Sequence, residues 1–595
     1  MQYSSLFIAL PPAAHPVAAR AAAILRRTVA ERCGVRADAP VAGSLWIVFA
    51  LDAGGAAEGY RIADDGPDVI RIAGADERGL LYGVGRFLRE ATFISGTFTP
   101  GAWRGASAPA KPVRGIYFAT HFHNFYHVAP LADLERYVEE LALWGCNALM
   151  VWFDMHHYRG MDDPDAQAMV ARLHDLLAAA ERVGMAPGLG FLANEAFADS
   201  PPAMRAEWTG GHDGYADVAL SHYHVELCPN KPGALDQLLR WRREVMAAFQ
   251  DVNLRYVWLW PYDQGGCTCP ACAPWGANGF LTCARAVGDL AREMFPGVQV
   301  ILSTWLFDAY IRGEWDGLRR HLQAGGHGLD YVLADVHDGA FPADRLAGKA
   351  SGNIRLLNFP EISMTGMAPW GGYGANPRPA HWQKYWQGAR DKVAGGFPYS
   401  EGMYEDINKV LHLQWNWDPD LDARQILTEY AAAYFGREVA PDVVQACYRL
   451  EEAMGDTKVL LEQGGQRHDI FWFAERLDPS RPWSLRYAGG RAEGVEGTLE
   501  LLESVDRRLT PAAQKSWRWR VLLLRGRLDC EIARSNGAPS VALDQAFEEL
   551  AALYGATRAV PCLTPPSSLH LKGLVATIPK RRQCETDPLE RDTRC

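Results

Sequence analysis

From residue 113 onward, the hydrophobic and polar positions repeat one pattern: a short apolar run, a polar or acidic end, and a stretch with helical periodicity. The apolar runs do not alternate with polar residues, which is typical of parallel strands covered on both faces. Eight such units predict an α/β fold built on a (β/α)8 TIM barrel. The predicted strands are Val113–Thr120, Ala148–Asp154, Ala186–Glu195, Tyr256–Asp263, Val298–Asp308, Tyr331–Asp338, Ile354–Glu361 and Gly396–Glu401.

The residues before this repeat alternate strand-like and helix-like segments, which predicts a small N-terminal α/β domain. Its last helix is expected at Asp76–Glu90, where apolar residues at helical spacing bury one face. The segment Thr97–Pro112 is rich in Gly, Ala and Pro and is predicted to be a linker.

After Trp417 the strand-like runs end and helical patterns follow. The last residues are charged and have no periodicity, which is typical of disorder. The predicted domains are an α/β domain at 1–110, the barrel at 111–419, a helical domain at 420–578 and a disordered tail at 579–595.

Composition narrows the class of protein. Hydrophobic residues make up 48% and charged residues 22%, as in soluble globular proteins. The net charge of -11 argues against nucleic acid or an anionic membrane as a partner. Twelve Cys without a secretion signal predict reduced thiols and a cytoplasmic location.

A carbohydrate is the expected partner, because aromatic residues stack on sugars and the chain has 20 Trp, 22 Tyr and 22 Phe. Any self-association is expected to give a homodimer.

The predicted strand ends carry the candidate chemistry. In a TIM barrel the catalytic groups sit at the carboxyl ends of the strands. Nearly every end here offers a carboxylate, and aromatic residues accompany most of them. Any one of these side chains could instead cap a helix or bond a loop, so the prediction depends on their recurrence. The candidate substrate-binding residues are His121, His123, Asp154, Glu195, Asp308, Asp335, His337, Trp275, Trp370, Tyr373, Tyr399, Glu405 and Asp406. Four tryptophans within the strands are expected in the core or the barrel lining: Trp152, Trp258, Trp260 and Trp305.

Carboxylates among aromatic residues suit the cleavage of glycosidic bonds, in which one carboxylic acid protonates the leaving oxygen and another acts as nucleophile or base. Asp263, at the end of the fourth strand, is predicted to be the general acid. Glu361, on the seventh strand, is predicted to be the nucleophile or base. Glu401, on the eighth, is expected to bind sugar hydroxyls or to replace Glu361.

The segment GADERGLLYGVGRFLRE resembles the N-terminal domain that precedes the barrels of family 20 hexosaminidases and family 67 α-glucuronidases. The domain order is similar to that of the α-glucuronidases. The resemblance implies an exo-acting or oligosaccharide-processing glycoside hydrolase. No cofactor is expected to be required. Family 20 enzymes carry an adjacent Asp-Glu on the fourth strand, where this chain has Asp263-Gln264, so their mechanism is not carried across.

A metal-dependent, amidohydrolase-like hydrolase is the alternative, because HFH at the end of the first strand places His121 and His123 as a metal-binding pair. Such a site also needs a histidine on the fifth strand, and that strand offers Asp308 instead. A non-catalytic sugar-binding protein is less favoured, because binding alone does not call for so many carboxylates.

The cysteines of C-T-C-P-A-C, namely Cys267, Cys269 and Cys272, follow the fourth strand. Cys228 or Cys283 is available as a fourth ligand. Thiolates at this spacing predict a structural zinc ion that fixes the loop carrying Asp263. The alternative is a set of reduced thiols packed in a loop.

Overall fold

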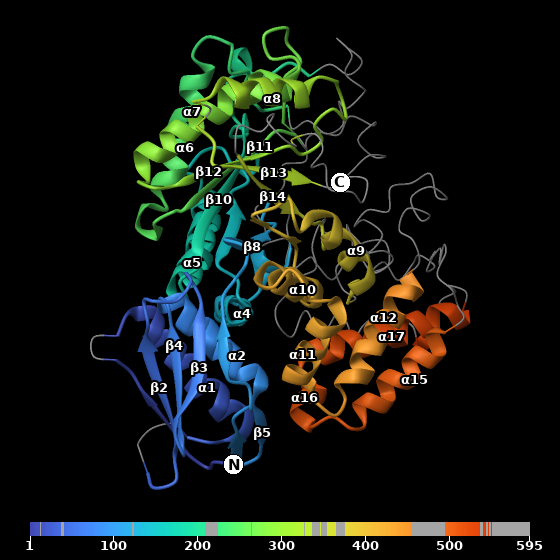
Figure 1. Cartoon of the computed structure of the whole chain (residues 1–595). Coiled ribbons are helices and arrows are strands. Elements are labelled where there is room, and N and C mark those ends of the chain that lie inside the picture. The colour runs from blue at the N-terminus through green and yellow to red at the C-terminus, as the bar shows by residue number, and fades with distance from the viewer. Residues whose placement is uncertain are drawn as a thin grey trace.

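The computed structural model describes the greater part of the chain. An N-terminal α/β domain, a barrel and a helical domain follow one another in sequence, and the two outer domains lie side by side beneath the barrel in Figure 1. The predicted tail lies outside the described residues. These are 1–11, 14–36, 41–121, 124–208, 224–262, 265–326, 328–335, 346, 354–363, 375–454, 494–535, 540–542, 545–546 and 549.

The N-terminal domain is a five-stranded mixed sheet with strand order β1-β2-β4-β3-β7. The first three of these strands are parallel, whereas β3 and β7 pair antiparallel. Its elements are β1 (Leu6–Ala9), α1 (Pro16–Cys33), β2 (Leu45–Leu51), β3 (Tyr60–Gly66), β4 (Val69–Gly74), α2 (Glu77–Glu90), β5 (Thr92–Ile94), β6 (Thr97–Thr99) and β7 (Gly105–Ser107). The predicted linker was therefore wrong in part, because β6 and β7 belong to this domain.

The central sheet closes into a parallel barrel, which confirms the predicted fold. Each strand pairs with its neighbour in sequence, and β15 and β16 return to β8. These two short segments flank Phe397 and Pro398 and together form the eighth strand. The barrel strands are β8 (Val113–Phe118), β9 (Ala148–Trp152), β10 (Ala186–Leu192), β11 (Tyr256–Trp260), β12 (Gln299–Ser303), β13 (Tyr331–Asp335), β14 (Arg355–Phe359), β15 (Gly395–Gly396) and β16 (Tyr399–Ser400).

Barrel closure depends on two glycines in the eighth strand. A Cβ at Gly395 would lie 1.7 Å from the carbonyl oxygen of Val113, and Gly395 has φ +128°, which favours glycine. A Cβ at Gly396 would lie 1.7 Å from Oδ1 of Asn358. A larger residue at either position would push the eighth strand away from β8 and β14.

Helices surround the barrel and form the C-terminal domain (Figure 1). Those of the barrel are α3 (Phe125–Val128), α4 (Leu131–Leu143), α5 (Pro164–Arg182), α6 (Ala234–Ala247), α7 (Gly279–Met294), α8 (Glu314–Ala324), α9 (Pro379–Ala389) and α10 (Asp406–Trp417). Short 3-10 turns lie at Met155–His157, Pro202–Met204, Gln250–Val252 and Trp275–Ala277. The C-terminal helices are α11 (Ala423–Phe435), α12 (Ala440–Met454), α15 (Val495–Asp506), α16 (Pro511–Lys515) and α17 (Trp517–Ser535).

The N-terminal domain faces the amino-terminal ends of the barrel strands. Arg114, a fully buried residue of β8, is bonded to Glu58 of the N-terminal domain. A cavity of about 550 Å³ in this region is lined by Glu58 together with Tyr256, Gln299 and Tyr331, the first residues of three barrel strands. The carboxyl ends, where the candidate residues lie, are thus at the opposite end of the barrel.

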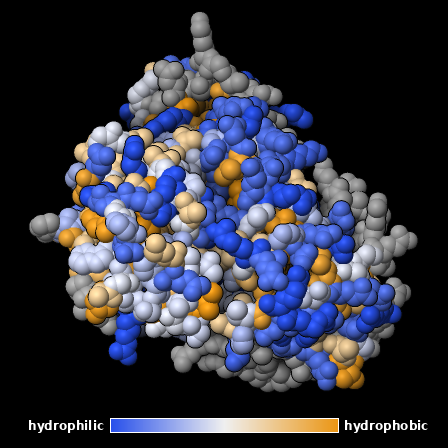
Figure 2. Space-filling view, turned by 60° about the horizontal axis from the view of Figure 1, so that its bottom comes forward, coloured by the Kyte–Doolittle hydropathy of each residue, from blue (hydrophilic) through white to orange (hydrophobic). Residues whose placement is uncertain are grey.

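The surface on the side of the outer domains mixes hydrophilic residues with small groups of hydrophobic ones (Figure 2). Several exposed large hydrophobic side chains belong to the N-terminal domain, among them Leu10, Trp46, Leu51 and Ile94. No helix within the described residues is long and apolar enough to cross a membrane. The expected homodimer stays a prediction.

Candidate active site at the carboxyl ends of the strands

Glu401 follows β16 and is the most strongly perturbed carboxyl group of the eighth strand. Its side chain is 1% exposed. The hydroxyl of Tyr399 donates to its Oε1 at 2.5 Å, and that of Tyr404 lies 3.5 Å from its Oε2. Burial is the main cause that raises the pKa of Glu401 to about 8. The negative charges of Glu405 and Glu361 raise this pKa further, whereas the hydrogen bonds from the two tyrosines lower it. Glu401 is therefore a neutral acid at pH 7, which is the state of a proton donor.

Glu361 follows β14, the strand next to the eighth, and is half-buried. Its charge acts on both Glu401 and Tyr399, so the two predicted carboxylates lie near each other. The structure thus brings together Glu361, Glu401 and Tyr399 of the predicted site.

Aromatic rings from several strands stand beside these carboxyl groups. Phe359 of β14 lies 5.9 Å from Tyr399 and 5.1 Å from Trp260 between ring centroids. Trp260 in turn lies 5.3 Å from Trp305 and 6.2 Å from Trp152. We call these five residues the aromatic wall. It confirms the expectation that Trp152, Trp260 and Trp305 line the barrel, and Trp258 is fully buried beneath them.

His121 joins the first strand to this wall. Its ring lies parallel to that of Tyr117, with centroids 5.7 Å apart, and 5.1 Å from Trp152. Its Nδ1 is hydrogen-bonded to the Tyr117 hydroxyl. Burial lowers the pKa of His121 to about 3, although Asp154 opposes the shift. His121 is therefore a neutral hydrogen-bonding group near neutral pH.

A second polar cluster comes from the ends of β9 and β10. Nδ1 of His156 lies 2.6 Å from Oδ1 of Asp154 and 2.9 Å from Oε1 of Glu195, and Nδ1 of His157 lies 2.8 Å from Oδ2 of Asp154. Burial opposes charge here, but Asp154 and Glu195 together raise the pKa of His156 to about 9. Both histidines hold the pKa of Asp154 well below its usual range despite its burial. Sequence analysis found Asp154 and Glu195 but missed the role of His156 as their charged partner.

Two acidic residues near Glu401 have structural partners instead of the predicted substrate-binding role. Oε1 of Glu405 accepts hydrogen bonds from the Ser400 hydroxyl at 2.5 Å and from the backbone amides of Glu401 and Gly402 at 3.0 and 3.1 Å. Asp406 accepts from Arg518 of α17 at 2.7 Å, as well as from two tyrosine hydroxyls. Glu405 thus holds the turn that carries Glu401, and Asp406 ties the barrel to the helical domain.

Asp308 and Trp275 also differ from their predicted role. Oδ1 of Asp308 accepts from the amide of Glu314, whose own carboxylate accepts from the amide of Asp308, both at 2.8 Å. Trp275 is fully buried, and its indole donates to the carbonyl of Pro261 at 2.7 Å. Asp308 therefore caps the start of α8, and Trp275 belongs to the core and offers no sugar platform.

Several predicted site residues lie outside the part of the chain that the structure describes: Asp263, His123, His337, Trp370 and Tyr373. Asp335 ends β13, and its side chain is outside as well. Their roles stay predictions.

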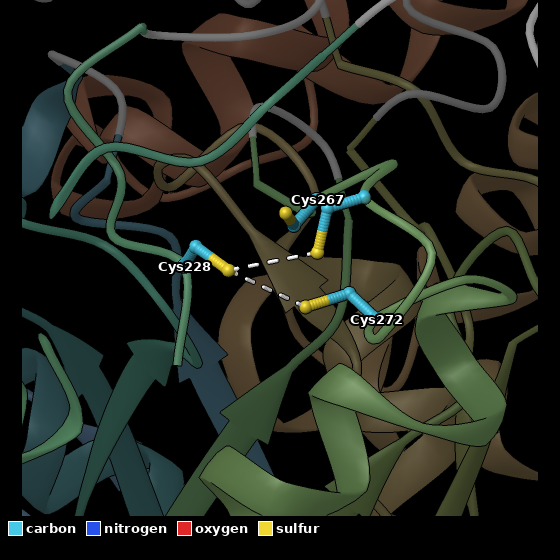
Figure 3. Close-up of side chains that lie close together, drawn as sticks. Cys228, Cys267 and Cys272 are labelled. Atoms are coloured by element: carbon cyan, nitrogen blue, oxygen red, sulfur yellow. Dashed lines mark hydrogen bonds between the residues drawn. The ribbon is translucent and has the colours of Figure 1, made fainter. Parts of the chain in front are cut away.

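The four predicted cysteine ligands come together. The sulfurs of Cys228, Cys267, Cys269 and Cys272 all lie within 4.8 Å of one another. Figure 3 shows Cys228 reaching across from its own loop toward Cys267 and Cys272. The structure thus selects Cys228 over Cys283, which lies on α7 outside this group.

The solved structures that resemble this chain include glycoside hydrolases. A family GH115 4-O-methyl-α-glucuronidase with specificity for decorated arabinogalactans is 14% identical, with a TM-score of 0.60 over 94% of this chain and 77% of that one. A GH138 enzyme targeting pectin rhamnogalacturonan II is 12% identical, with a TM-score of 0.57 over 93% and 92%. A GH20 exo-β-N-acetylglucosaminidase from Vibrio harveyi is 14% identical, with a TM-score of 0.50 over 75% of each chain.

No protein-family model matches the sequence, and the comparison with curated proteins found no match. At the identities above, the likeness is one of fold. It confirms the predicted architecture of an N-terminal α/β domain and a barrel resembling those of family 20 enzymes.

Proposed function

We propose that the protein is a glycoside hydrolase that works with carboxyl groups at the carboxyl ends of the barrel strands. The observation that carries the proposal is Glu401, a buried carboxylic acid that is neutral at pH 7 and lies near a second carboxylate, Glu361, beside the aromatic wall. Cleavage of a glycosidic bond requires two carboxyl groups held in different protonation states. The fold shared with glycoside hydrolases supports the same conclusion.

In the proposed reaction, Glu401 gives its proton to the oxygen of the leaving group as the bond to the sugar breaks. Glu361 either attacks the sugar carbon as a nucleophile or acts as the base that activates the attacking water. Trp305, the half-buried member of the aromatic wall, stacks on the sugar. The buried rings of the wall lower the local dielectric, which keeps Glu401 protonated until transfer. After transfer Glu401 is a carboxylate that still accepts a hydrogen bond from Tyr399.

This assignment differs from the sequence-based one, in which Asp263 is the acid, and the two can be separated. Glu401→Gln and Asp263→Asn are each assayed on a natural leaving group and on an activated aryl leaving group, which needs little protonation. The variant that lacks the acid should lose about 10²–10⁴-fold in kcat on the natural substrate and recover on the aryl one. Glu361→Gln should lose activity on both. Near-normal activity of all three variants would refute the proposed roles.

The substrate panel should contain aryl glycosides of both anomers, 4-O-methyl-glucuronides and fragments of rhamnogalacturonan II. The last two are included because the structural neighbours act on decorated arabinogalactans and on pectin rhamnogalacturonan II. The stereochemistry of the first product, followed by NMR, reports retention or inversion. Absence of hydrolysis across the whole panel would count against the proposed function.

A metal-dependent hydrolase is the second candidate, favoured by one observation. Ligand atoms of Asp154, His156 and His157 all lie within 4.8 Å of one another, as a metal site requires. A metal ion would have to replace the contacts between Asp154 and the two histidines. If this candidate holds, His156→Gln should lose one equivalent of bound metal together with activity. If the glycosidase mechanism holds, that variant keeps its metal content.

A further inference from the structure

The four clustered sulfurs have the spacing of a metal-thiolate centre. Zinc bound by four thiolates is tetrahedral with Zn–S bonds of about 2.3 Å, which places neighbouring sulfurs about 3.8 Å apart. The Cys228 sulfur lies 3.7 Å from that of Cys269 and 3.7 Å from that of Cys272. A disulfide needs about 2.05 Å between sulfurs, so these are not disulfide pairs. We propose that Cys228, Cys267, Cys269 and Cys272 bind one structural zinc ion.

The backbone around the cluster is folded as a thiolate site requires. The amide of Lys231 donates to the carbonyl of Cys228 at 3.1 Å, and that of Cys272 donates to the carbonyl of Cys269 at 2.9 Å. Cys228 and Cys269 thus each begin a tight turn. The side-chain amide of Asn230 also donates to the Cys272 sulfur at 3.1 Å. Such hydrogen bonds offset the negative charge that four thiolates and one Zn²⁺ leave at the centre.

Burial supports a metal centre over loosely packed thiols. Cys228, Cys267 and Cys272 are at most 1% exposed, and Cys269 is half-buried. Their sulfurs lie together, and three of the four cysteines belong to the hydrophobic core, so an ion held between them would be shielded from water. Cys283 offers the contrast, because it is fully buried on the apolar face of α7 and takes no part in the cluster.

The ion would join two loops next to the candidate active site. Cys228 lies between β10 and α6, whereas the other three ligands lie between β11 and α7. Asn194 already bridges these loops: its Nδ2 donates to the carbonyls of Leu227 at 3.1 Å and Gly266 at 2.8 Å. The next residue, Glu195, holds His156 in the polar cluster. The zinc ion would therefore hold the loop between β11 and α7 against the loop between β10 and α6, which begins next to Glu195 of the polar cluster.

The test is made on the full chain, purified without chelator and without added metal. Elemental analysis should give about one zinc per chain. Cys269→Ser should lose that zinc and lower the apparent Tm by about 5 °C or more, because a half-buried thiol contributes little by packing and much as a ligand. Cys283→Ser is the matched control, and it should keep the zinc although it changes a more deeply buried cysteine.

Replacement of the metal by Co²⁺ provides a direct readout of the ligands. Cobalt bound tetrahedrally by thiolates gives intense visible bands and thiolate-to-metal charge-transfer bands, whose positions and intensities depend on the number of thiolates. Cys269→Ser should therefore weaken and shift these bands. Wild-type protein without zinc, iron in place of zinc, or zinc retained at full occupancy in both Cys269→Ser and Cys228→Ser would each overturn the proposal. These measurements need no substrate, so they stand or fall apart from the proposed glycosidase activity.

Discussion

Replacing Glu401 by Gln is expected to make the barrel more stable in alkaline buffer while it removes the proposed acid. The pKa of Glu401 is raised from 4.5 to about 8, mainly by burial. A carboxyl group with a raised pKa favours folding while it is protonated and opposes folding once it ionises. The stability that the protonated Glu401 side chain contributes is therefore fully present below about pH 4.5 and is lost as the pH rises through 8.

The magnitude follows from the shift. One pKa unit corresponds to about 1.36 kcal/mol, so a shift of about 3.5 units gives about 5 kcal/mol at full effect. Relaxation around the ionised group reduces this penalty, and we expect about 3–5 kcal/mol between pH 4.5 and 9. Gln carries no charge at any pH and keeps the carbonyl oxygen that accepts from Tyr399. Glu401→Gln therefore avoids the cost of a buried charge, and its stability should match that of wild type at low pH.

The assay is thermal unfolding of wild type and Glu401→Gln followed by Trp fluorescence from pH 4.5 to 9. A free-energy difference of about 3–5 kcal/mol corresponds to about 6–10 °C in a barrel of this size. The Tm of the variant should equal that of wild type near pH 5 and exceed it increasingly up to about pH 8. Glu405→Ala is the control, since it removes the acceptor of three hydrogen bonds and should destabilise the protein. A difference between wild type and Glu401→Gln that does not change with pH would refute the reasoning.

Two further sets of variants test other parts of the structure. Tyr399→Phe removes a hydrogen bond that favours the ionised form of Glu401, so the alkaline limb of the pH profile of kcat/KM should move to higher pH. Tyr404→Phe removes the longer contact and should move this limb less. A shift to lower pH would contradict the assignment of Glu401 as the acid. Glu58→Ala should cost about 3–5 kcal/mol in the free energy of unfolding, because it leaves the buried Arg114 without its carboxylate partner. Glu58→Ala with wild-type Tm would show that this ion pair contributes little.

The barrel could be predicted from the sequence because its strands are buried on both faces. Runs such as YVWLW at Tyr256–Trp260 are apolar throughout, because a strand that is covered on both faces buries every side chain. The antiparallel strand at Tyr60–Gly66 was missed because its second half, ADDG, is polar and exposed at the end of the sheet. The strand at Gly105–Ser107 was assigned to a linker because GAS carries no hydrophobic signal.

The positions of candidate residues were predicted better than their roles. Strand ends place a carboxylate near the mouth of the barrel, but the direction of its side chain depends on partners far away in sequence. Asp406 binds Arg518, which lies 112 positions later on α17. The pKa of His156 is raised by Asp154, two positions earlier, and by Glu195, 39 positions later at the end of the next strand. The contacts with Arg518 and Glu195 have no local sequence signal. The cysteine cluster was easier to predict, since the spacing Cys-x-Cys-x2-Cys is itself a sequence signal and few other cysteines could join it.

The segment Ser400–Asp406 illustrates how one strand end serves three purposes. Glu401 remains neutral beside aromatic rings, Glu405 binds the amides of the turn, and Asp406 begins α10 and pairs with Arg518. Lys409, one helical turn after Glu405, donates to the hydroxyl of Tyr137 at 2.7 Å and lies 3.5 Å from Glu405. The ionised residues on this segment therefore have fixed partners in the barrel and the helical domain. These contacts hold the turn in place and so support Glu401 in its buried, neutral state.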